Sequence, residues 1–355
     1  ELGIAENESQ AMSGDEIDQL SKEQLQEVVK TVRIFARVSP ENKVAIVQAI
    51  KANGNIAAMT GDGVNDAPSL KTADIGIAMG ITGTDVAKGA ADMILTDDNF
   101  ASIEKAVEEG RGIYANIKKT VLFLLGSNLA EVLTMFVVSL LSLFANPYDL
   151  KTPLLSIHIL WVNLITDSLP AVALGADEKE KGVMNAKPRD SKESLFSKGG
   201  AAIMVGYGLL ITLCTLTAFF IVPIIELCSS GCNPTFIEIC RILEEEPDVL
   251  MSAQTCAFCT LSLSELFHML GMTSIKKSFV HNFKTKNPLI WISFVLGVAL
   301  QIAVVEIPGI NTFFQCGQVD LAHWGIIFGL SIMPLVAHEI VALILFIRRK
   351  AKERK

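Results

Sequence analysis

Long apolar stretches, separated by short polar loops, fill the chain from about residue 121 to near its end. A helix of about 20 apolar residues is long enough to cross the hydrocarbon core of a bilayer. A hydrophobic content of 50% fits such helices beside a smaller soluble part. We therefore expect a multi-pass membrane protein whose partner is the lipid bilayer. The expected spans are 119–144, 153–175, 199–225, 251–272, 288–307 and 322–347.

The charged residues between these stretches predict their orientation. Lysine and arginine gather in alternate loops, and such loops face the cytosol in membrane proteins. Both ends of the chain are therefore expected in the cytosol. The chain opens with no signal-peptide pattern. A net charge of −8, without a basic stripe, argues against nucleic-acid binding. The basic regions are 118–119, 179–198, 276–286 and 348–355.

The first hundred residues alternate short apolar runs with helical patterns, which predicts a parallel, doubly wound α/β sheet. Residues 100–144 contain no proline, and their composition changes midway from charged to apolar. We expect one helix there, about 60 Å long at 1.5 Å per residue. The predicted strands are 34–38, 55–59, 75–79 and 93–95, and the predicted helices are 21–32, 40–51, 67–72 and 84–91.

A polar turn follows the predicted strand 55–59 and holds two carboxylates, Asp62 and Asp66, four residues apart. Parallel sheets carry their chemistry at this edge. Carboxylates are hard oxygen ligands for Mg²⁺, and the glycines of the turn let the backbone approach an anion. The pattern favours a Mg²⁺ and phosphate site. A plain Asp-Gly turn followed by a helix cap at Asn65 and Asp66 is the structural alternative.

Three acids stand within the expected membrane spans, where a charged side chain costs about 2.5–3.5 kcal/mol on insertion scales. Amide and hydroxyl side chains stand near these acids in the same spans. Carboxylate, amide and hydroxyl oxygens are the ligands that Ca²⁺ prefers. Pro170 removes a backbone donor and should loosen the helix near the second acid. Hydrogen bonding between helices is the alternative, although it explains three acids poorly. The candidate Ca²⁺ ligands are Asn128, Glu131, Asn163, Thr166, Asp167 and Glu265.

The sequence TGDGVNDAPSL at 60–70 resembles the hinge motif of P-type ATPases, ion pumps whose phosphorylation domain has the haloacid-dehalogenase fold. The resemblance continues upstream at 35–38 and downstream at 73–80 and 97–100. The sequences SNLAE at 127–131 and LWVNLITDSLPA at 160–171 resemble the fifth and sixth membrane helices of sarco/endoplasmic-reticulum-type calcium pumps. Ser168 departs from the glycine usual there, and the match at Glu265 is looser.

The resemblance implies that residues 1–100 are the C-terminal part of a haloacid-dehalogenase-like phosphorylation domain and 101–355 a transmembrane bundle of six helices with a stalk. It implies catalytic roles for Lys43, Asp62, Asn65 and Asp66, with Asp62 binding Mg²⁺. The DKTGT motif whose aspartate is phosphorylated does not occur in the chain. ATP would be bound mainly by an N-terminal part that completes the pump.

The implied function is ATP-driven transport of Ca²⁺ out of the cytosol, with counter-transport of protons, in a bacterial plasma membrane. Related calcium pumps often carry a disulfide in the loop before the fourth span here, so we expect two of Cys228, Cys232 and Cys240 to pair. Mn²⁺ or a monovalent ion remains open as cargo. A membrane-anchored phosphatase of the haloacid-dehalogenase type and a non-pumping regulatory fragment are alternatives of other classes.

Overall fold

The structure, a computed structural model, describes residues 3–179, 182–190, 193–197, 199–274, 278 and 287–353. The chain divides into two compact units. The first comprises residues 1–110 and 188–191, and the second comprises 111–187 and 192–355. The basic loop 276–286, which supports part of the predicted orientation, lies almost wholly outside the described residues.

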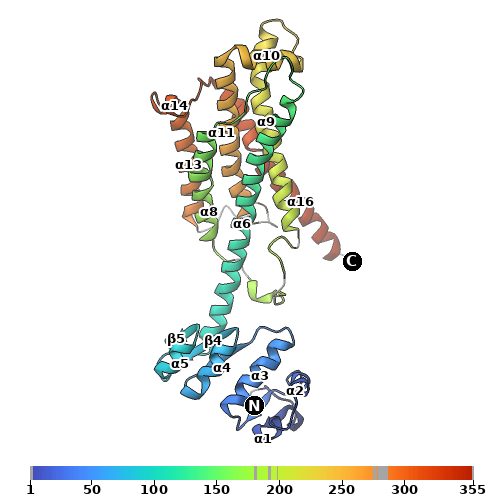
Figure 1. The fold of residues 1–355 in the computed structure, drawn as a ribbon, viewed down its shortest axis with the longest axis vertical. Helices are drawn as coiled ribbons and strands as arrows, with labels where there is room; N and C mark the ends of the chain where they lie inside the picture. The colour runs from blue at the N-terminus through green and yellow to red at the C-terminus, as the bar shows by residue number, and fades with distance from the viewer. Residues whose placement is uncertain are drawn as a thin grey trace. The chain divides into compact units, whose positions relative to one another are not determined.

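Short strands and helices alternate through the first unit, as the sequence predicts (Figure 1). All strand pairs are parallel, which confirms the predicted direction. The strands are β1 (Ala11–Ser13), β2 (Ile34–Ala36), β3 (Ala58–Gly61), β4 (Ile75–Met79) and β5 (Met93–Leu95). The helices are α1 (Gly14–Ile17), α2 (Lys22–Val28), α3 (Pro40–Ala52), α4 (Ala67–Thr72) and α5 (Asp85–Ala90).

The prediction of one continuous sheet is wrong for the described residues. The strands form two sheets, β1-β2 and β3-β4-β5. Each sheet buries its apolar side chains in its own small core. The two sheets therefore need not join to bury these side chains. Ile17 and Leu25 belong to the core of the first sheet, and Leu70 and Ala78 to that of the second. An apolar cavity of about 360 Å³ lies between α3 and β3.

Helix α3 shows how local sequence sets an element that carries a candidate site residue. The hydroxyl of Ser39 accepts a hydrogen bond from the Asn42 N–H at 3.1 Å, and Pro40 occupies the first turn. Both features favour a helix start. The helix ends at Ala52, and Gly54 follows with a φ of +80°. Lys43 thereby lies one turn from the helix N-terminus.

Six helical segments of the described residues are long and apolar enough to cross a membrane, as the sequence predicts. Helix α6 (Ala101–Ser142) is continuous, which confirms the predicted long helix. The second and sixth segments are not single α-helices, because a π-helical turn, η3 (Val162–Thr166), and a break at Ile332 interrupt them. The remaining helices of the six segments are α7 (Ser156–Trp161), α8 (Ser168–Gly175), α9 (Gly200–Ser229), α11 (Pro247–Met272), α13 (Pro288–Glu306), α15 (Leu321–Ser331) and α16 (Met333–Glu353).

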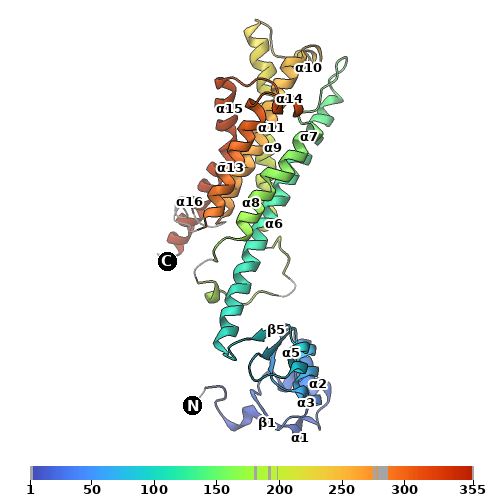
Figure 2. The same cartoon turned by 90° about the vertical axis from the view of Figure 1, so that its left-hand side faces the viewer.

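Helix α11 forms the centre of the second unit (Figure 2). Its side chains are buried almost continuously from Ala253 to Met272, polar ones included. Helices α9, α13, α15 and α16 pack around it. Two short helices, α10 (Phe236–Glu245) and α14 (Ile310–Phe313), lie at one end of the bundle. A polar side chain on α11 between Ala253 and Met272 is therefore surrounded by protein.

The predicted disulfide is not present in the structure. Cys228, Cys232 and Cys240 are all free thiols. Cys240 lies on the inner face of α10, fully buried in the apolar core of the bundle, whereas Cys228 and Cys232 are exposed. Cys240 therefore lies in a different environment from the other two cysteines of the predicted set.

Candidate functional site

Three buried acids from different segments meet inside the second unit. Glu131 lies on α6, Asp167 joins η3 to α8, and Glu265 lies on α11. One carboxylate oxygen from each lies within 4.8 Å of the other two. The residues are only 5%, 2% and 0% exposed, respectively. The structure thus brings together the three acids that the sequence singled out.

Two further predicted residues bind the acids through hydrogen bonds. The Asn163 amide donates to both carboxylate oxygens of Glu131, at 3.0 Å each. The Thr166 hydroxyl lies 3.1 Å from Glu265 Oε2 and donates to it. These contacts orient two of the carboxylates and leave the third, Asp167, unconstrained by side-chain hydrogen bonds.

Several oxygens of this carboxylate cluster lack a partner within the described part of the chain. Both Asp167 oxygens and Glu265 Oε1 are buried without a hydrogen bond. No lysine or arginine of the described residues forms an ion pair with the cluster. Buried polar groups are nearly always satisfied in native proteins, so these oxygens are available to a ligand. Ca²⁺ binds oxygens at about 2.3–2.6 Å, so two ligands of one ion can lie up to about 5 Å apart. The 4.8 Å grouping fits one ion.

The π-helical turn η3 ends directly before Asp167 and so sets the direction of the Asp167 carboxylate. The Asp167 N–H donates to the Val162 carbonyl at 2.9 Å, five residues back, and the Ser168 hydroxyl donates to the Asn163 carbonyl at 3.1 Å. Pro170 cannot donate to the carbonyl four residues before it. Single π turns are frequent at functional sites. The sequence analysis predicted from Pro170 that the helix loosens near Asp167, but it did not predict a π-helical turn.

Asn128 is the predicted ligand that the structure leaves outside these contacts. It is partly buried one turn before Glu131, and its amide donates to the Leu124 carbonyl of its own helix at 2.9 Å. Its amide oxygen remains a possible ligand on the same stretch of α6. The structure therefore assembles the acids with Asn163 and Thr166 directly, and Asn128 only by proximity in sequence.

The second candidate site is the loop after β3 in the first unit. Asp66 is buried, and its carboxylate accepts hydrogen bonds from Lys43 Nζ at 2.5 Å and from the N–H groups of Asp62 and Gly63 at 3.2 Å each. Burial alone would raise the pKa of Asp66, but the Lys43 ammonium and the two N–H groups outweigh it, so the pKa lies below its ordinary value. A side chain at Gly61 would collide with Asp66. Asp66 thus fixes the shape of this loop.

Asp62 and Asn65 lie exposed on the same loop. The Asp62 carbonyl accepts the Thr84 N–H at 2.8 Å, which ties the loop to the start of α5. Its carboxylate follows directly on the C-terminal end of β3, where it is open to a metal ion. An exposed carboxylate on a loop that also binds the Lys43 ammonium suits Mg²⁺ with a phosphate, because Mg²⁺ keeps most of its waters and takes few protein ligands.

Asp98 is a well-connected residue whose contacts the sequence analysis did not predict. Its carboxylate accepts hydrogen bonds from the N–H groups of Gly80, Ile81 and Thr82, at 2.6–3.0 Å, and from the Thr82 hydroxyl at 2.8 Å. The N–H group of Ile81 and these other donors lower the pKa of Asp98 to about 2. Its φ of +48° was not predictable from an Asp-Asp-Asn sequence. It anchors the turn after β4.

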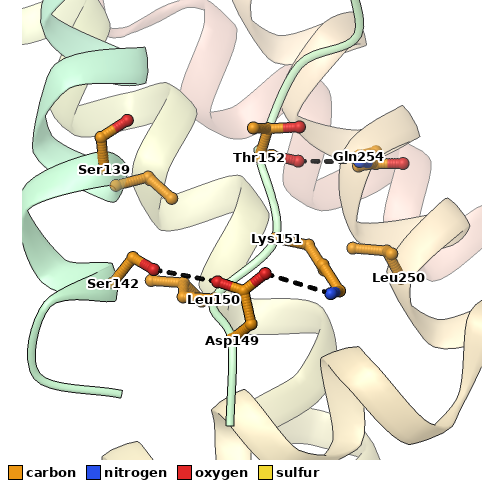
Figure 3. Close-up of a pocket in the computed structure, with 9 residues that line it drawn as sticks. Ser139, Ser142, Asp149, Leu150, Lys151, Thr152, Leu250 and Gln254 are labelled. Carbon is orange, nitrogen blue, oxygen red and sulfur yellow. Dashed lines mark hydrogen bonds and ion pairs between the residues drawn. The ribbon is translucent and has the colours of Figure 1, made fainter. Parts of the chain in front are cut away.

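A polar pocket of about 430 Å³ lies near the end of α6, away from the carboxylate cluster (Figure 3). Its polar groups satisfy one another. Asp149 accepts from Ser142 at 3.1 Å and from Lys151 at 3.2 Å, and Gln254 donates to the Thr152 carbonyl at 2.7 Å. It therefore lacks the orphaned oxygens that mark the cluster.

Comparison with known proteins identifies a family match that lies almost wholly within the second unit. Residues 151–344, which contain Asp167 and Glu265, match the family model described as the C-terminus of cation transporting ATPases. The chain belongs to the cation transporting ATPase family. The six apolar segments and this membership make it an integral membrane protein.

Calcium-transporting ATPases are among the relatives of this cation transporting ATPase chain. It is 50% identical to calcium-transporting ATPase 1 of Bacillus cereus, covering 97% of this chain and 37% of the relative. It is 41% identical to the calcium-transporting ATPase of Bacillus subtilis, covering 94% and 34%. It is 35% identical to an endoplasmic reticulum calcium ATPase of Aspergillus fumigatus, covering 92% and 34%. The chain thus spans about a third of the length of these relatives.

Proposed function

We propose that the chain is the C-terminal part of a P-type ATPase that transports Ca²⁺ out of the cytosol. The observation that carries the proposal is the carboxylate cluster of Glu131, Asp167 and Glu265, in which one oxygen of each acid lies within 4.8 Å of the other two. Asp167 and Glu265 also have buried oxygens without a hydrogen bond among the described residues. Its oxygen-only ligands suit a hard divalent ion. The names of the relatives support the same cargo.

The ion itself is the transported substrate. Glu131 and Asp167 supply negative charge to it, while Asn163 and Thr166 hold the carboxylates of Glu131 and Glu265 in place. When the ion leaves, three buried acids require another positive charge, which protons from the opposite side can supply. Proton counter-transport belongs to this proposal.

The chemistry in the first unit is positioning and charge neutralisation of a phosphorylated aspartate from residues outside this chain. Asp62 would hold Mg²⁺, which supplies charge stabilisation when bound. Lys43 carries the ammonium, Asp66 holds Lys43 and the loop in place, and Asn65, exposed on the same loop, would contact the phosphate. The two separate parallel sheets are consistent with a haloacid-dehalogenase-like domain that is completed by further strands.

Ca²⁺-activated ATP hydrolysis by the full-length protein tests the proposal. Activation by micromolar Ca²⁺, absent in Glu131→Gln, is the expected result, with Mn²⁺, Na⁺ and K⁺ as comparison ions. Activation by one of these ions instead, with Ca²⁺ inactive, would overturn the choice of cargo. A bacterial plasma membrane is the proposed location, since the two bacterial relatives are among the most similar proteins.

A further inference from the structure

A second group of buried charges lies in the second unit, apart from the carboxylate cluster. Lys119, on α6, forms an ion pair with Asp177, with Nζ and Oδ2 3.0 Å apart. The two side chains are 6% and 5% exposed, so the pair is buried. The Lys119 ammonium also donates to the Thr273 carbonyl at 3.2 Å.

A third residue strengthens the link between Lys119 and Asp177. Asn116, three residues earlier on α6 and itself buried, donates from Nδ2 to the Asp177 carbonyl at 2.5 Å. Residues three apart lie on one face of a helix. Asp177 is therefore held to this face of α6 through its carboxylate and its backbone.

The segments joined by this pair are the ones that carry the three acids. Asp177 follows the end of α8, which begins after Asp167, and Thr273 directly follows α11, which carries Glu265. Lys119 precedes Glu131 on α6 by twelve residues, about 18 Å at 1.5 Å per residue. The pair therefore does not touch the cluster and can act on it only through the helices.

We propose that Lys119 and Asp177 are a positioning pair for the carboxylate cluster. The pair fixes the relative register of α6, α8 and α11, and so holds one oxygen of each acid within reach of a single ion. A buried ion pair suits this task, because it is satisfied in only one geometry and a small slide of any helix would separate its charges. The proposal rests on the proposed transport of Ca²⁺.

The test measures the apparent Ca²⁺ affinity of the full-length protein in Ca²⁺-dependent phosphorylation by ATP. The double variant Lys119→Met with Asp177→Leu removes both charges and leaves no unpaired buried ion. We expect its apparent Ca²⁺ affinity to fall roughly tenfold, through altered cluster geometry. Phosphorylation by inorganic phosphate without Ca²⁺ should stay within about twofold of wild type, because that chemistry uses the first unit.

Two comparisons separate positioning from a general loss of stability. Lys119→Arg keeps the charge and should keep the affinity within about threefold. Lys151→Met with Asp149→Leu breaks an exposed ion pair in the same unit and should leave the affinity unchanged. If the double variant at Lys119 and Asp177 does not fold, Asp177→Asn decides in its place, with a loss of affinity expected.

Wild-type Ca²⁺ affinity in the double variant, or in Asp177→Asn where that variant decides, would overturn the inference. An equal loss of affinity in the Lys151 control would also overturn it, because any broken ion pair would then have the same effect. A wild-type protein that shows no Ca²⁺-dependent phosphorylation would refute the proposed function instead. The two failures are therefore distinguishable.

Discussion

The two candidate sites differ in how well their polar groups are satisfied. In the loop after β3, the Asp66 carboxylate has an ammonium partner in Lys43 and two backbone N–H donors. In the bundle, the Asp167 carboxylate has no hydrogen bond among the described residues, and Glu265 keeps one orphaned oxygen. The first site is complete in its own contacts, whereas the second is not.

Under the proposed function, this difference separates a site built for fixed geometry from one built to receive and release a cargo. A satisfied loop holds its donors and charges in place before the reactants arrive, which is how phosphoryl transfer is stabilised. Unsatisfied buried oxygens gain most from an ion that fills them. Replacing an acid should therefore affect ion binding in the bundle and chemistry in the loop.

The largest expected effect is that of Asp167→Asn in the full-length protein. The change removes one charge and one anionic ligand from a buried site that has no other compensation. We expect Ca²⁺-dependent phosphorylation by ATP to fall by about 100-fold or more, since charged buried contacts are worth several kcal/mol. Phosphoenzyme formation over a Ca²⁺ titration measures it, and Ca²⁺-free phosphorylation by inorganic phosphate is the control.

Asp62→Asn should give the opposite pattern. The variant loses the proposed Mg²⁺ carboxylate while the Asp66 and Lys43 contacts remain, so phosphoenzyme chemistry should fall by about 100-fold with Ca²⁺ binding retained. Radioactive Ca²⁺ binding and phosphorylation on the same preparation measure both. Loss of Ca²⁺ binding together with normal phosphorylation would erase the contrast between the two sites.

A smaller effect is expected from Trp161→Phe. Trp161 is the last residue of α7 and directly precedes η3. The Trp161 indole donates to Gln301 Oε1 at 3.0 Å, and Ser262, one turn before Glu265, donates to the same oxygen at 2.8 Å. Removing one donor should lower the apparent Ca²⁺ affinity about fivefold, in line with roughly 1 kcal/mol for a hydrogen bond.

Trp324→Phe is the matched control for that variant, because the Trp324 indole donates to Glu306 at 2.8 Å in an exposed position. The control should bind Ca²⁺ with wild-type affinity. Equal effects in the two tryptophan variants would show that the link from η3 to α11 has no special part in the site.

The smallest effect concerns the stability of the first unit at low pH. The pKa of Asp98 is about 2 in the folded protein, below its ordinary value near 4. Its stabilising contribution is therefore fully present above about pH 4 and is lost as the pH falls through about 2. Asp98→Asn should speed pepsin cleavage of the β4–β5 region at pH 4, and the difference from wild type should shrink toward pH 2. A constant difference over this range would contradict the linkage.

The sequence predicted the parts of this molecule that depend on local pattern. The spans follow from runs of apolar residues, the long helix α6 from an unbroken stretch, and the acids of the cluster from their rarity in membrane helices. Helices such as α3 follow from caps and prolines. These signals lie within one segment and need no knowledge of the tertiary contacts.

Features that depend on contacts between segments were not predicted. The π turn η3 results from competition among the donors around Pro170, and the burial of Cys240 depends on how α10 packs on the bundle. The pairing of Lys119 with Asp177 joins residues far apart in sequence, without any motif. The division into two sheets reflects two small cores, which strand patterns alone do not reveal.

Equilibrium Ca²⁺ binding to the full-length protein, in the absence of ATP, tests the central claim most directly. The protein should bind Ca²⁺ with micromolar affinity, and Glu131→Gln and Glu265→Gln should each weaken binding by about 100-fold, because each removes a charged ligand from one buried cluster. Wild-type Ca²⁺ binding in both variants would contradict the account, since the cluster would then not be the ion site.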